Sequence, residues 1–229
     1  MVRRWEPDLR EARAAAALGH HYLALTDHSP RLTVAHGLDA DRLRRQLDSV
    51  AAVNEELAPF RLLAGIEVDI LVDGSLDQDE DLLDRLDVVV ASVHSKLRMD
   101  ADAMTERMVA AIENPRSDVL GHCTGRLVVG RGRPPSAFDA EAVFAACART
   151  GTAVEVNSRP ERLDPPVDLL RQAAGVGCLV AIDTDAHAPG QLEWQHHGCA
   201  QALAAGVPPA RVVNTWPLDR LLAWSRTRS

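Results

Sequence analysis

The residues with the clearest potential for chemistry are histidines and carboxylates that follow short apolar runs. Six ligand-type side chains stand at such places: His28, Glu67, His94, His122, Asp185 and His187. Imidazole and carboxylate groups are the ligands that zinc, manganese and iron prefer in proteins. Any one of these histidines, taken singly, is better explained as a core or capping residue. Six ligand-type residues at equivalent places favour a metal centre.

Glu67 and the Asp185–His187 pair give the sharpest indications of a shared site. Glu67 follows the apolar run Leu62–Ile66, where a buried carboxylate is destabilising unless a metal or a base pairs with it. An ion pair with Arg61 or Arg126 is the simpler alternative. Asp185 and His187 are two residues apart, so in an extended strand their side chains point the same way.

Strands and helices that would position these residues alternate along the chain. Apolar, β-branched runs predict six buried strands: Tyr22–Thr26, Leu62–Leu71, Asp87–Val93, Asp118–Gly121, Thr152–Val156 and Leu179–Ile182. Amphipathic stretches predict the helices: Leu9–Leu18, Asp39–Leu57, Glu80–Arg85, Asp100–Asn114, Asp139–Thr150, Val167–Val176 and Gln191–Ala205. A short extended piece, Arg211–Trp216, and a terminal helix, Pro217–Ser225, should cover one end of the fold.

This alternation indicates a mostly parallel α/β sheet with right-handed crossovers. The sequence contains neither G-x-G-x-x-G nor G-x-x-x-x-G-K, so a nucleotide-binding open sheet lacks its usual signature and a barrel is favoured. In a barrel the carboxyl ends of all strands share one face, which would bring the six ligand-type residues together.

Length and composition indicate the number of domains, the state of the cysteines and the kinds of partner to expect. With 229 residues and 46% hydrophobic content, the chain is expected to form one domain over residues 1–229. A net charge of −8 disfavours binding of long nucleic acid through its phosphates without a partner protein. The four scattered cysteines predict reduced, structural thiols. The apolar runs are too short to cross a bilayer, so we expect a cytoplasmic protein with no membrane contact.

Several charged residues lie just beyond the expected strand ends. Lys96, Arg126 and Arg159 are candidates for holding a phosphate, because cations there can offset its charge. Solvated loop charge explains them equally well. Asp27 and Asp69 stand beside candidate ligands and could orient a histidine ring, although strand-end capping is an equal alternative.

The motifs at the strand ends resemble those of the PHP (polymerase and histidinol phosphatase) domain. They match in order and in separation: Leu25-Thr26-Asp27-His28, Gly65-Ile66-Glu67-Val68-Asp69, Ala91-Ser92-Val93-His94-Ser95, Gly121-His122 and Asp183-Thr184-Asp185-Ala186-His187. The resemblance covers nearly the whole chain from about Ala14. Segments Gly121–Leu127 and Glu155–Pro166 are most similar to the PHP module at the C-terminus of bacterial family X DNA polymerases and to its free-standing relatives.

The resemblance implies a distorted (β/α)7 TIM-like barrel. The family opens with a strand ending in a His-x-His pair, which has no counterpart in this sequence, so we expect a barrel without its first strand. Such a barrel would have open edges through which a homo-oligomer could form.

The resemblance also implies a ligand set of two or three divalent ions, Zn, Mn or Fe. Glu67 would bridge two of them, with His94 and His122 completing one and Asp185 holding the other. His28 and His187 would hold the third. Without the opening strand, only the Glu67–His94–His122 site keeps three protein ligands. Direct catalytic roles are expected of Glu67, Asp185 and His187.

The implied activity is hydrolysis of a phosphate ester by a metal-activated water, as in a phosphatase or a 3′-5′ exonuclease. The substrate would be a small phosphorylated molecule or a nucleic-acid 3′ end. Two alternatives remain open. One is a catalytically impaired metal-binding or interaction module that has lost its first strand. The other is an amidohydrolase, against which Glu67 and the absence of a carboxylated-lysine pattern speak.

Overall fold

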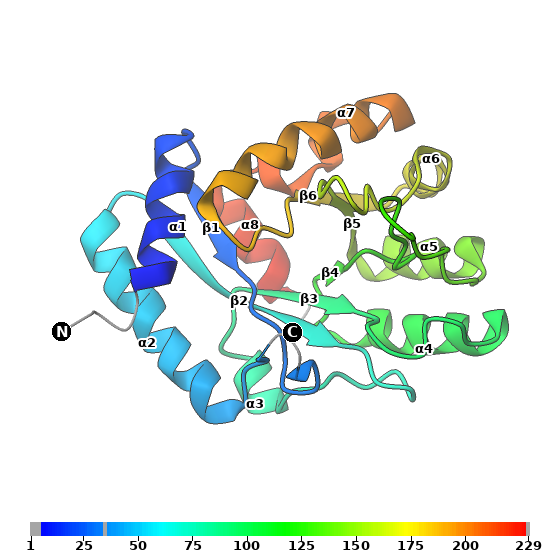
Figure 1. Ribbon diagram of the computed structural model, residues 1–229, viewed down its shortest axis with the longest axis horizontal. Coiled ribbons are helices and arrows are strands. Elements are labelled where there is room, and N and C mark those ends of the chain that lie inside the picture. The colour runs from blue at the N-terminus through cyan, green and yellow to red at the C-terminus, as the bar shows by residue number, and fades with distance from the viewer. Residues whose placement is uncertain (1–5, 34–35, 228–229) are drawn as a thin grey trace.

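Six parallel strands form the centre of the computed structural model, which describes residues 6–33 and 36–227. They are β1 (Tyr22–Leu25), β2 (Arg61–Asp69), β3 (Val88–Ser92), β4 (Val119–Leu120), β5 (Ala153–Asn157) and β6 (Leu179–Asp183). Each strand pairs with the next one in the chain, so the order in the sheet is the order in the sequence. The sheet curls into a half-barrel with helices around its outside (Figure 1). The predicted α/β, TIM-like class is confirmed.

Helices cover the outer face of the sheet: α1 (Glu6–Ala17), α2 (Ala40–Leu57), α3 (Glu80–Leu83), α4 (Ala101–Glu113), α5 (Ala140–Thr150), α6 (Val167–Val176) and α7 (Gln195–Ala205). Aspartate side chains cap the backbone N–H groups that open α2, α4 and α5. A glycine with positive φ ends each of α5, α6 and α7. The predicted helix Gln191–Ala205 is divided, because a 3-10 helix, η2 (Pro189–Trp194), precedes α7.

The four cysteines are free thiols, three of them buried and Cys199 exposed. None of the helices within residues 6–33 and 36–227 combines the length and the apolar character that a membrane span requires.

The inner face of the half-barrel changes character along the strands, as β2 shows. Leu62 packs outward among residues of α1 and α2, whereas Leu63 packs inward with the first residues of β3, β4 and β5. Because side chains alternate along a strand, Glu67 and Asp69 lie on the same inner face as Leu63. The interior is therefore apolar at the amino ends of the strands and polar at their carboxyl ends.

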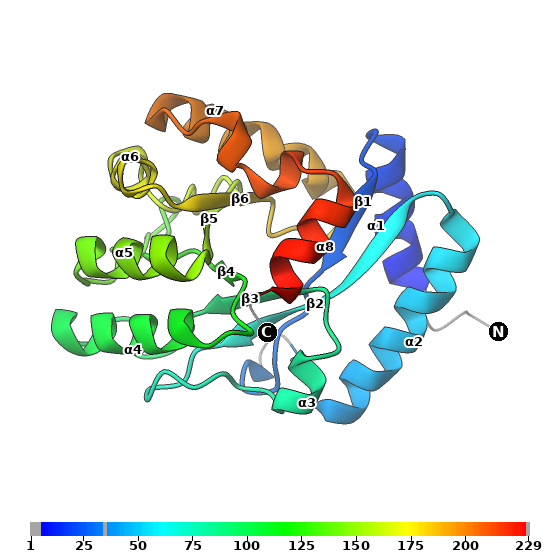
Figure 2. The same ribbon diagram turned by 180° about the vertical axis from the view of Figure 1, so that it is seen from behind.

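The C-terminal segment fills the apolar end of this interior. It contains η3 (Pro209–Arg211), η4 (Val213–Thr215) and α8 (Leu218–Arg226). Figure 2 shows α8 in front of β2 and β3. Val213, Trp216 and Leu221 pack against the inner residues of the strands. The predicted terminal helix is confirmed. The extended piece Arg211–Trp216 is wrong, because prolines at 208, 209 and 217 remove backbone donors and favour turns.

Asn214 joins this segment to the last strand, and Tyr22 joins it to the first. The side-chain amide of Asn214 donates to Ile182 O at 2.8 Å and accepts from Ile182 N at 2.7 Å. Val212 forms a parallel bridge with Val180. The Tyr22 hydroxyl donates to Asn214 O at 3.2 Å and to Trp216 O at 2.9 Å. The expectation of open edges is therefore wrong in part at β6, because the C-terminal segment covers some of that edge, and the expected homo-oligomer stays a prediction.

Candidate metal centre

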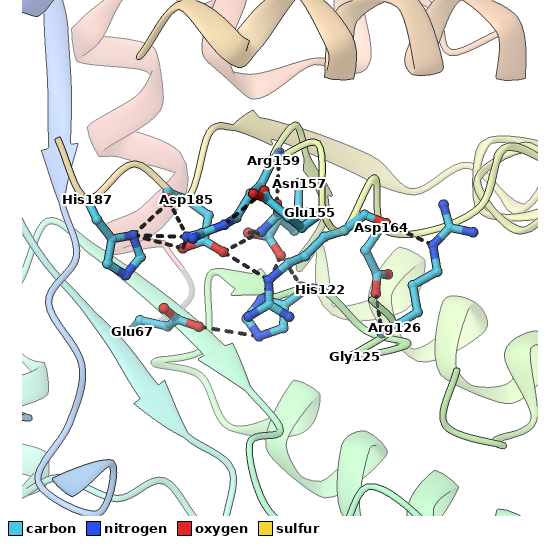
Figure 3. Close-up of polar contacts among 12 residues, drawn as sticks. Glu67, His122, Gly125, Arg126, Glu155, Asn157, Arg159, Asp164, Asp185 and His187 are labelled. Atoms are coloured by element: carbon cyan, nitrogen blue, oxygen red, sulfur yellow. Dashed lines mark hydrogen bonds and ion pairs between the residues drawn. The ribbon is translucent and has the colours of Figure 1, made fainter. Parts of the chain in front are cut away.

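Glu67 lies at the centre of the polar end of the half-barrel, and His122 points toward it (Figure 3). Glu67 Oε1 is 3.1 Å from His94 Nε2 and 3.5 Å from His122 Nε2. The two imidazole Nε2 atoms are 3.2 Å apart. Ligand atoms bound at 2.0–2.1 Å in a tetrahedron are separated by about 3.3 Å. These three atoms therefore have the spacing of one face of a tetrahedral metal site.

The second oxygen of Glu67 faces another histidine. Glu67 Oε2 is 3.2 Å from His28 Nδ1, and His28, Glu67 and His94 each place one ligand atom within 4.8 Å of the others. His28 Nδ1 and Glu67 Oε1 are nevertheless buried without a hydrogen bond in the described residues. Buried polar atoms without partners are destabilising, and a cation between them would remove that cost. The residues fit a divalent metal, with Glu67 able to share its two oxygens between two positions.

Neighbouring groups control the protonation of this cluster. Burial raises the pKa of Glu67, but the contact with His94 and the adjacent imidazoles outweigh burial and hold the pKa well below its usual range. Burial lowers the pKa of His94, whereas its contacts with Asp69 and Glu67 raise it, with a final value of about 9. Burial also lowers the pKa of His28. An ion at this site must therefore displace a proton from His94 near neutral pH.

Two buried carboxylates turn the ligand nitrogens toward Glu67. Asp69 Oδ1 accepts a hydrogen bond from His94 N at 3.1 Å and lies 3.3 Å from His94 Nδ1. Glu155 Oε2 accepts from His122 N and lies 3.2 Å from His122 Nδ1. With Nδ1 held in this way, Nε2 of each ring faces the proposed ion. Asp27, which the sequence suggested for such a role, is exposed and accepts from Gln46 on α2.

Glu155 lies next to a second buried carboxyl group, that of Asp183 on β6. Burial and the nearby charge of Glu155 raise the pKa of Asp183 well above its usual range. Burial also raises the pKa of Glu155, but His122 outweighs it and the pKa is lowered. Asp183 therefore holds a proton more readily than Glu155 and can donate a hydrogen bond to it. Sequence reasoning missed this pair, although both residues alternate with the outward-facing Val154, Val156 and Ile182.

Asp185 and His187 lie together for a different reason from the one expected. β6 ends at Asp183, and Asp185 has a left-handed φ of 48°. Asp185 and His187 therefore do not lie on an extended strand, and the predicted extended geometry is wrong. His187 Nδ1 is still 3.6 Å from Asp185 Oδ1, and its ring centroid is 6.4 Å from that of His28. The His187 side chain is 55% exposed, so it lies at the rim of the site.

Arginines surround Asp185. Arg162 Nε donates to Asp185 Oδ2 at 3.0 Å, and Arg159 Nη1 lies 3.6 Å from Asp185 Oδ1. Arg159 Nη1 is also 3.2 Å from His187 Nδ1 (Figure 3). Asn157 adds an amide donor to Asp185 at 3.3 Å. Sequence reasoning selected Arg159 but not Arg162.

The other two predicted cations are placed differently. Arg126 donates from Nε to Arg162 O at 3.0 Å and from Nη2 to Leu163 O. Its guanidinium therefore holds the backbone of the loop that carries Arg162. Lys96 is exposed, with a positive φ of 51°. The structure does not bring either side chain to Asp185.

A further arginine stabilises the loops next to the site through hydrogen bonds to their backbone. Arg107 on α4 is 2% exposed and donates to Ile70 O, to Leu71 O at 2.8 Å and to Ser95 O at 2.9 Å. These carbonyls belong to the loops that follow β2 and β3. Arg107 thus fixes the two strand ends that carry Glu67 and His94. A helical arginine with this role has no sequence motif that would have revealed it.

A cleft of about 340 Å³ opens beside the cluster. Its polar lining residues are His28, Arg159, Glu161, Arg162, Asp185 and His187, and its other lining residues are Leu127, Val129 and Gly130. A small anion in this cleft would lie between the arginines and the candidate ligands. The arrangement can therefore hold a charged group next to a metal ion.

Known proteins resemble the chain in sequence. It is 38% identical over 213 residues to the DNA polymerase/3′-5′ exonuclease PolX of Bacillus subtilis, a match that covers 93% of this chain and 37% of the polymerase. It is 27% identical over 214 residues to a probable phosphatase of Thermoanaerobacter sp. and 28% identical over 213 residues to one of Syntrophotalea carbinolica. Each of these matches covers 89% of this chain and 82% of the phosphatase. No family model matches the chain.

A solved structure resembles it in fold. The crystal structure of histidinol phosphate phosphatase from Lactococcus lactis, complexed with zinc, L-histidinol and phosphate, has a TM-score of 0.54 and 15% sequence identity. The match covers 87% of both chains. At that identity the likeness establishes the fold alone, but it agrees with the sequence relatives. The predicted resemblance to the PHP family is confirmed.

Proposed function

We propose that this chain, as one domain over residues 1–229, is a metal-dependent phosphoesterase. The observation that carries the proposal is the triangle of Glu67 Oε1, His94 Nε2 and His122 Nε2, with edges of 3.1, 3.2 and 3.5 Å beside a cleft with two arginines. The names of the relatives, a 3′-5′ exonuclease and probable phosphatases, support the same reaction class.

Within this proposal the ligands divide into groups that share Glu67. Glu67, His94 and His122 would hold one ion, and His28 would hold a second with the other oxygen of Glu67. Asp185 and His187 would complete a second or third position. Zinc, manganese or iron suits this donor set. Bound ions would supply an activated water and neutralise charge on the phosphate.

The residues of the cleft would bind and orient the substrate. Arg159 and Arg162 would hold the phosphate, since a guanidinium matches phosphate oxygens in two-point contacts. Arg126 would act indirectly, by holding the loop of Arg162. Lys96 stays a predicted substrate contact. A small phosphomonoester and a nucleic-acid 3′ end are both compatible with this arrangement.

The test is metal removal and restoration in the purified chain. Exhaustive treatment with EDTA should abolish hydrolysis of a phosphomonoester and of a single-stranded oligonucleotide, and Mn²⁺ or Zn²⁺ should restore it. Mock-treated protein is the control. Full activity after complete metal removal would overturn the proposal. Metal binding without any hydrolysis would favour an impaired metal-binding module instead.

A further inference from the structure

The cleft beside the metal centre is lined by two chemically different sets of residues. Arg159, Arg162, Asp185 and His187 supply charged and polar groups from the loops that follow β5 and β6. Leu127 and Val129 supply apolar side chains from the segment 125–133, which follows β4. A phosphate and its metal ions account for the first set only. The apolar set requires a separate explanation.

Backbone hydrogen bonds fix the shape of the segment 125–133, which lines the cleft. Leu127 and Arg133 exchange backbone hydrogen bonds of 3.0 and 2.8 Å, so the segment folds back on itself as a short hairpin. Gly130 and Gly132, with φ of 69° and 65°, turn the chain between these two residues. Val128 N donates to Glu161 O at 2.7 Å, which ties the hairpin to the loop of Arg159 and Arg162.

Of two adjacent, exposed valines in this hairpin, one lines the cleft and the other does not. Val128 and Val129 are 50% and 57% exposed, which places both among the few large apolar side chains left in contact with water. Val129 lines the cleft and Val128 does not. Exposed apolar surface within a binding cleft gains stability when an apolar ligand removes it from water. Val129 thus offers a contact next to the position of the phosphate.

Resting on the proposed phosphoesterase function, we propose that Leu127 and Val129 form a subsite for the organic group of the substrate. The arginines hold the phosphate, so the group attached to it extends toward the hairpin. The favoured substrates are phosphate esters in which an aromatic or other apolar group lies close to the phosphate. Esters of polyols such as glycerol gain nothing from this subsite.

Phosphonates test the subsite without chemistry, because they resemble phosphate esters and are not hydrolysed. The affinities of phenylphosphonate and methylphosphonate for the metal-loaded full chain are measured by calorimetry. We expect phenylphosphonate to bind about tenfold more tightly. Val129→Ser should reduce that ratio to about threefold or less and leave methylphosphonate binding unchanged. Val128→Ser is the matched control, because it alters a valine of similar exposure outside the cleft.

Each outcome decides one question. Equal affinity for the two phosphonates, or equal effects of the Val128 and Val129 substitutions, overturns the subsite and leaves the phosphoesterase proposal intact. If neither phosphonate binds and inorganic phosphate also fails to bind, the phosphoesterase proposal itself fails. Discrimination that depends on Val129 and not on Val128 establishes the subsite.

Discussion

The inner face of one sheet is built in two opposite ways at its two ends. At the amino ends of the strands, Leu63, Val88 and Val119 pack against Trp216 and Leu221 of the C-terminal segment. At the carboxyl ends, the same face presents Glu67, Glu155 and Asp183. Packing of the first kind stabilises the fold, whereas burial of carboxylates without an ion destabilises it. Substitutions at the two ends should therefore separate folding from ligand binding.

The largest effect is expected at the apolar end. Trp216→Ala removes a 7% exposed indole that also stacks under Arg220, and it should lower the free energy of unfolding by about 3–5 kcal/mol. Metal affinity of the folded protein should be unchanged. Urea denaturation and metal titration measure the two quantities. Leu203→Ala, at an 83% exposed position on α7, should change stability by less than about 0.5 kcal/mol. A loss of metal affinity with unchanged stability would contradict the division between the two ends.

At the polar end, Glu67→Gln should mainly lower metal affinity, whereas Trp216→Ala mainly lowers stability. A neutral amide cannot bridge two cations, so metal affinity and hydrolysis should each fall by more than about 100-fold, beyond the loss typical of a residue that only supports a ligand. Stability of the metal-free protein should fall by less than in Trp216→Ala, because only the attraction between the Glu67 charge and the histidines around it is lost. Metal analysis, turnover and thermal unfolding check these expectations. Asp27→Asn, an exposed change outside the ligand cluster, is the control. Full metal content and turnover in Glu67→Gln would remove Glu67 from the site.

A smaller effect is expected one step away from the ligands. Glu155→Gln keeps the shape of the side chain but loses the charge that holds His122 Nδ1, so metal affinity should fall by about 10- to 100-fold. Titration with Zn²⁺ at fixed pH measures the change. Glu141→Gln, on the exposed surface of α5, should leave the affinity unaltered. If both substitutions weaken binding equally, Glu155 has no special part in orienting His122.

The mildest test uses pH alone. The pKa of His94 is raised to about 9, so a proton competes with the metal below that value. Apparent metal affinity should rise by up to about tenfold per pH unit between pH 7 and 9. Stability of the metal-free protein should change in the opposite sense. Because the folded pKa lies above the unfolded value, the protonated ring stabilises the fold below about pH 6.5, and this is lost as pH rises toward 9.

Both pH trends can be measured on one preparation, by metal titration and by urea unfolding at each pH. In the metal-free His94→Asn protein, stability should no longer decline as the pH rises from about 6.5 toward 9. Metal affinity that does not vary between pH 7 and 9 would show that His94 carries no proton at neutral pH.

The sheet and most of its ligands could be predicted because their signals are local. Apolar, β-branched runs located all six strands within a few residues. Histidines directly after those runs are carried to one face by any parallel barrel, so His28, His94 and His122 meet at Glu67. No knowledge of distant contacts is needed for either inference.

The supporting residues could not be predicted because their roles depend on distant partners. Arg107 lies within an ordinary helix, and only the packing of α4 brings it to the loops after β2 and β3. Glu155 and Asp183 lie within strands, where alternation gives a face but not the partner across it. The positive φ of Asp185 is a property of its loop, which the D-x-H spacing does not reveal.

The bond between Tyr22 and the C-terminal segment has a consequence for synthesis of the protein. The hydroxyl of Tyr22 meets carbonyls that are 192 and 194 residues later in the chain. A chain growing from its N-terminus can form the outer helices early, but it cannot cover the apolar end of the sheet until Trp216 and Leu221 have been added. Contacts of such long separation also form late when the whole chain refolds. Nascent chains that end before Asn214 therefore leave an apolar surface open, and association with other chains is favoured at that stage.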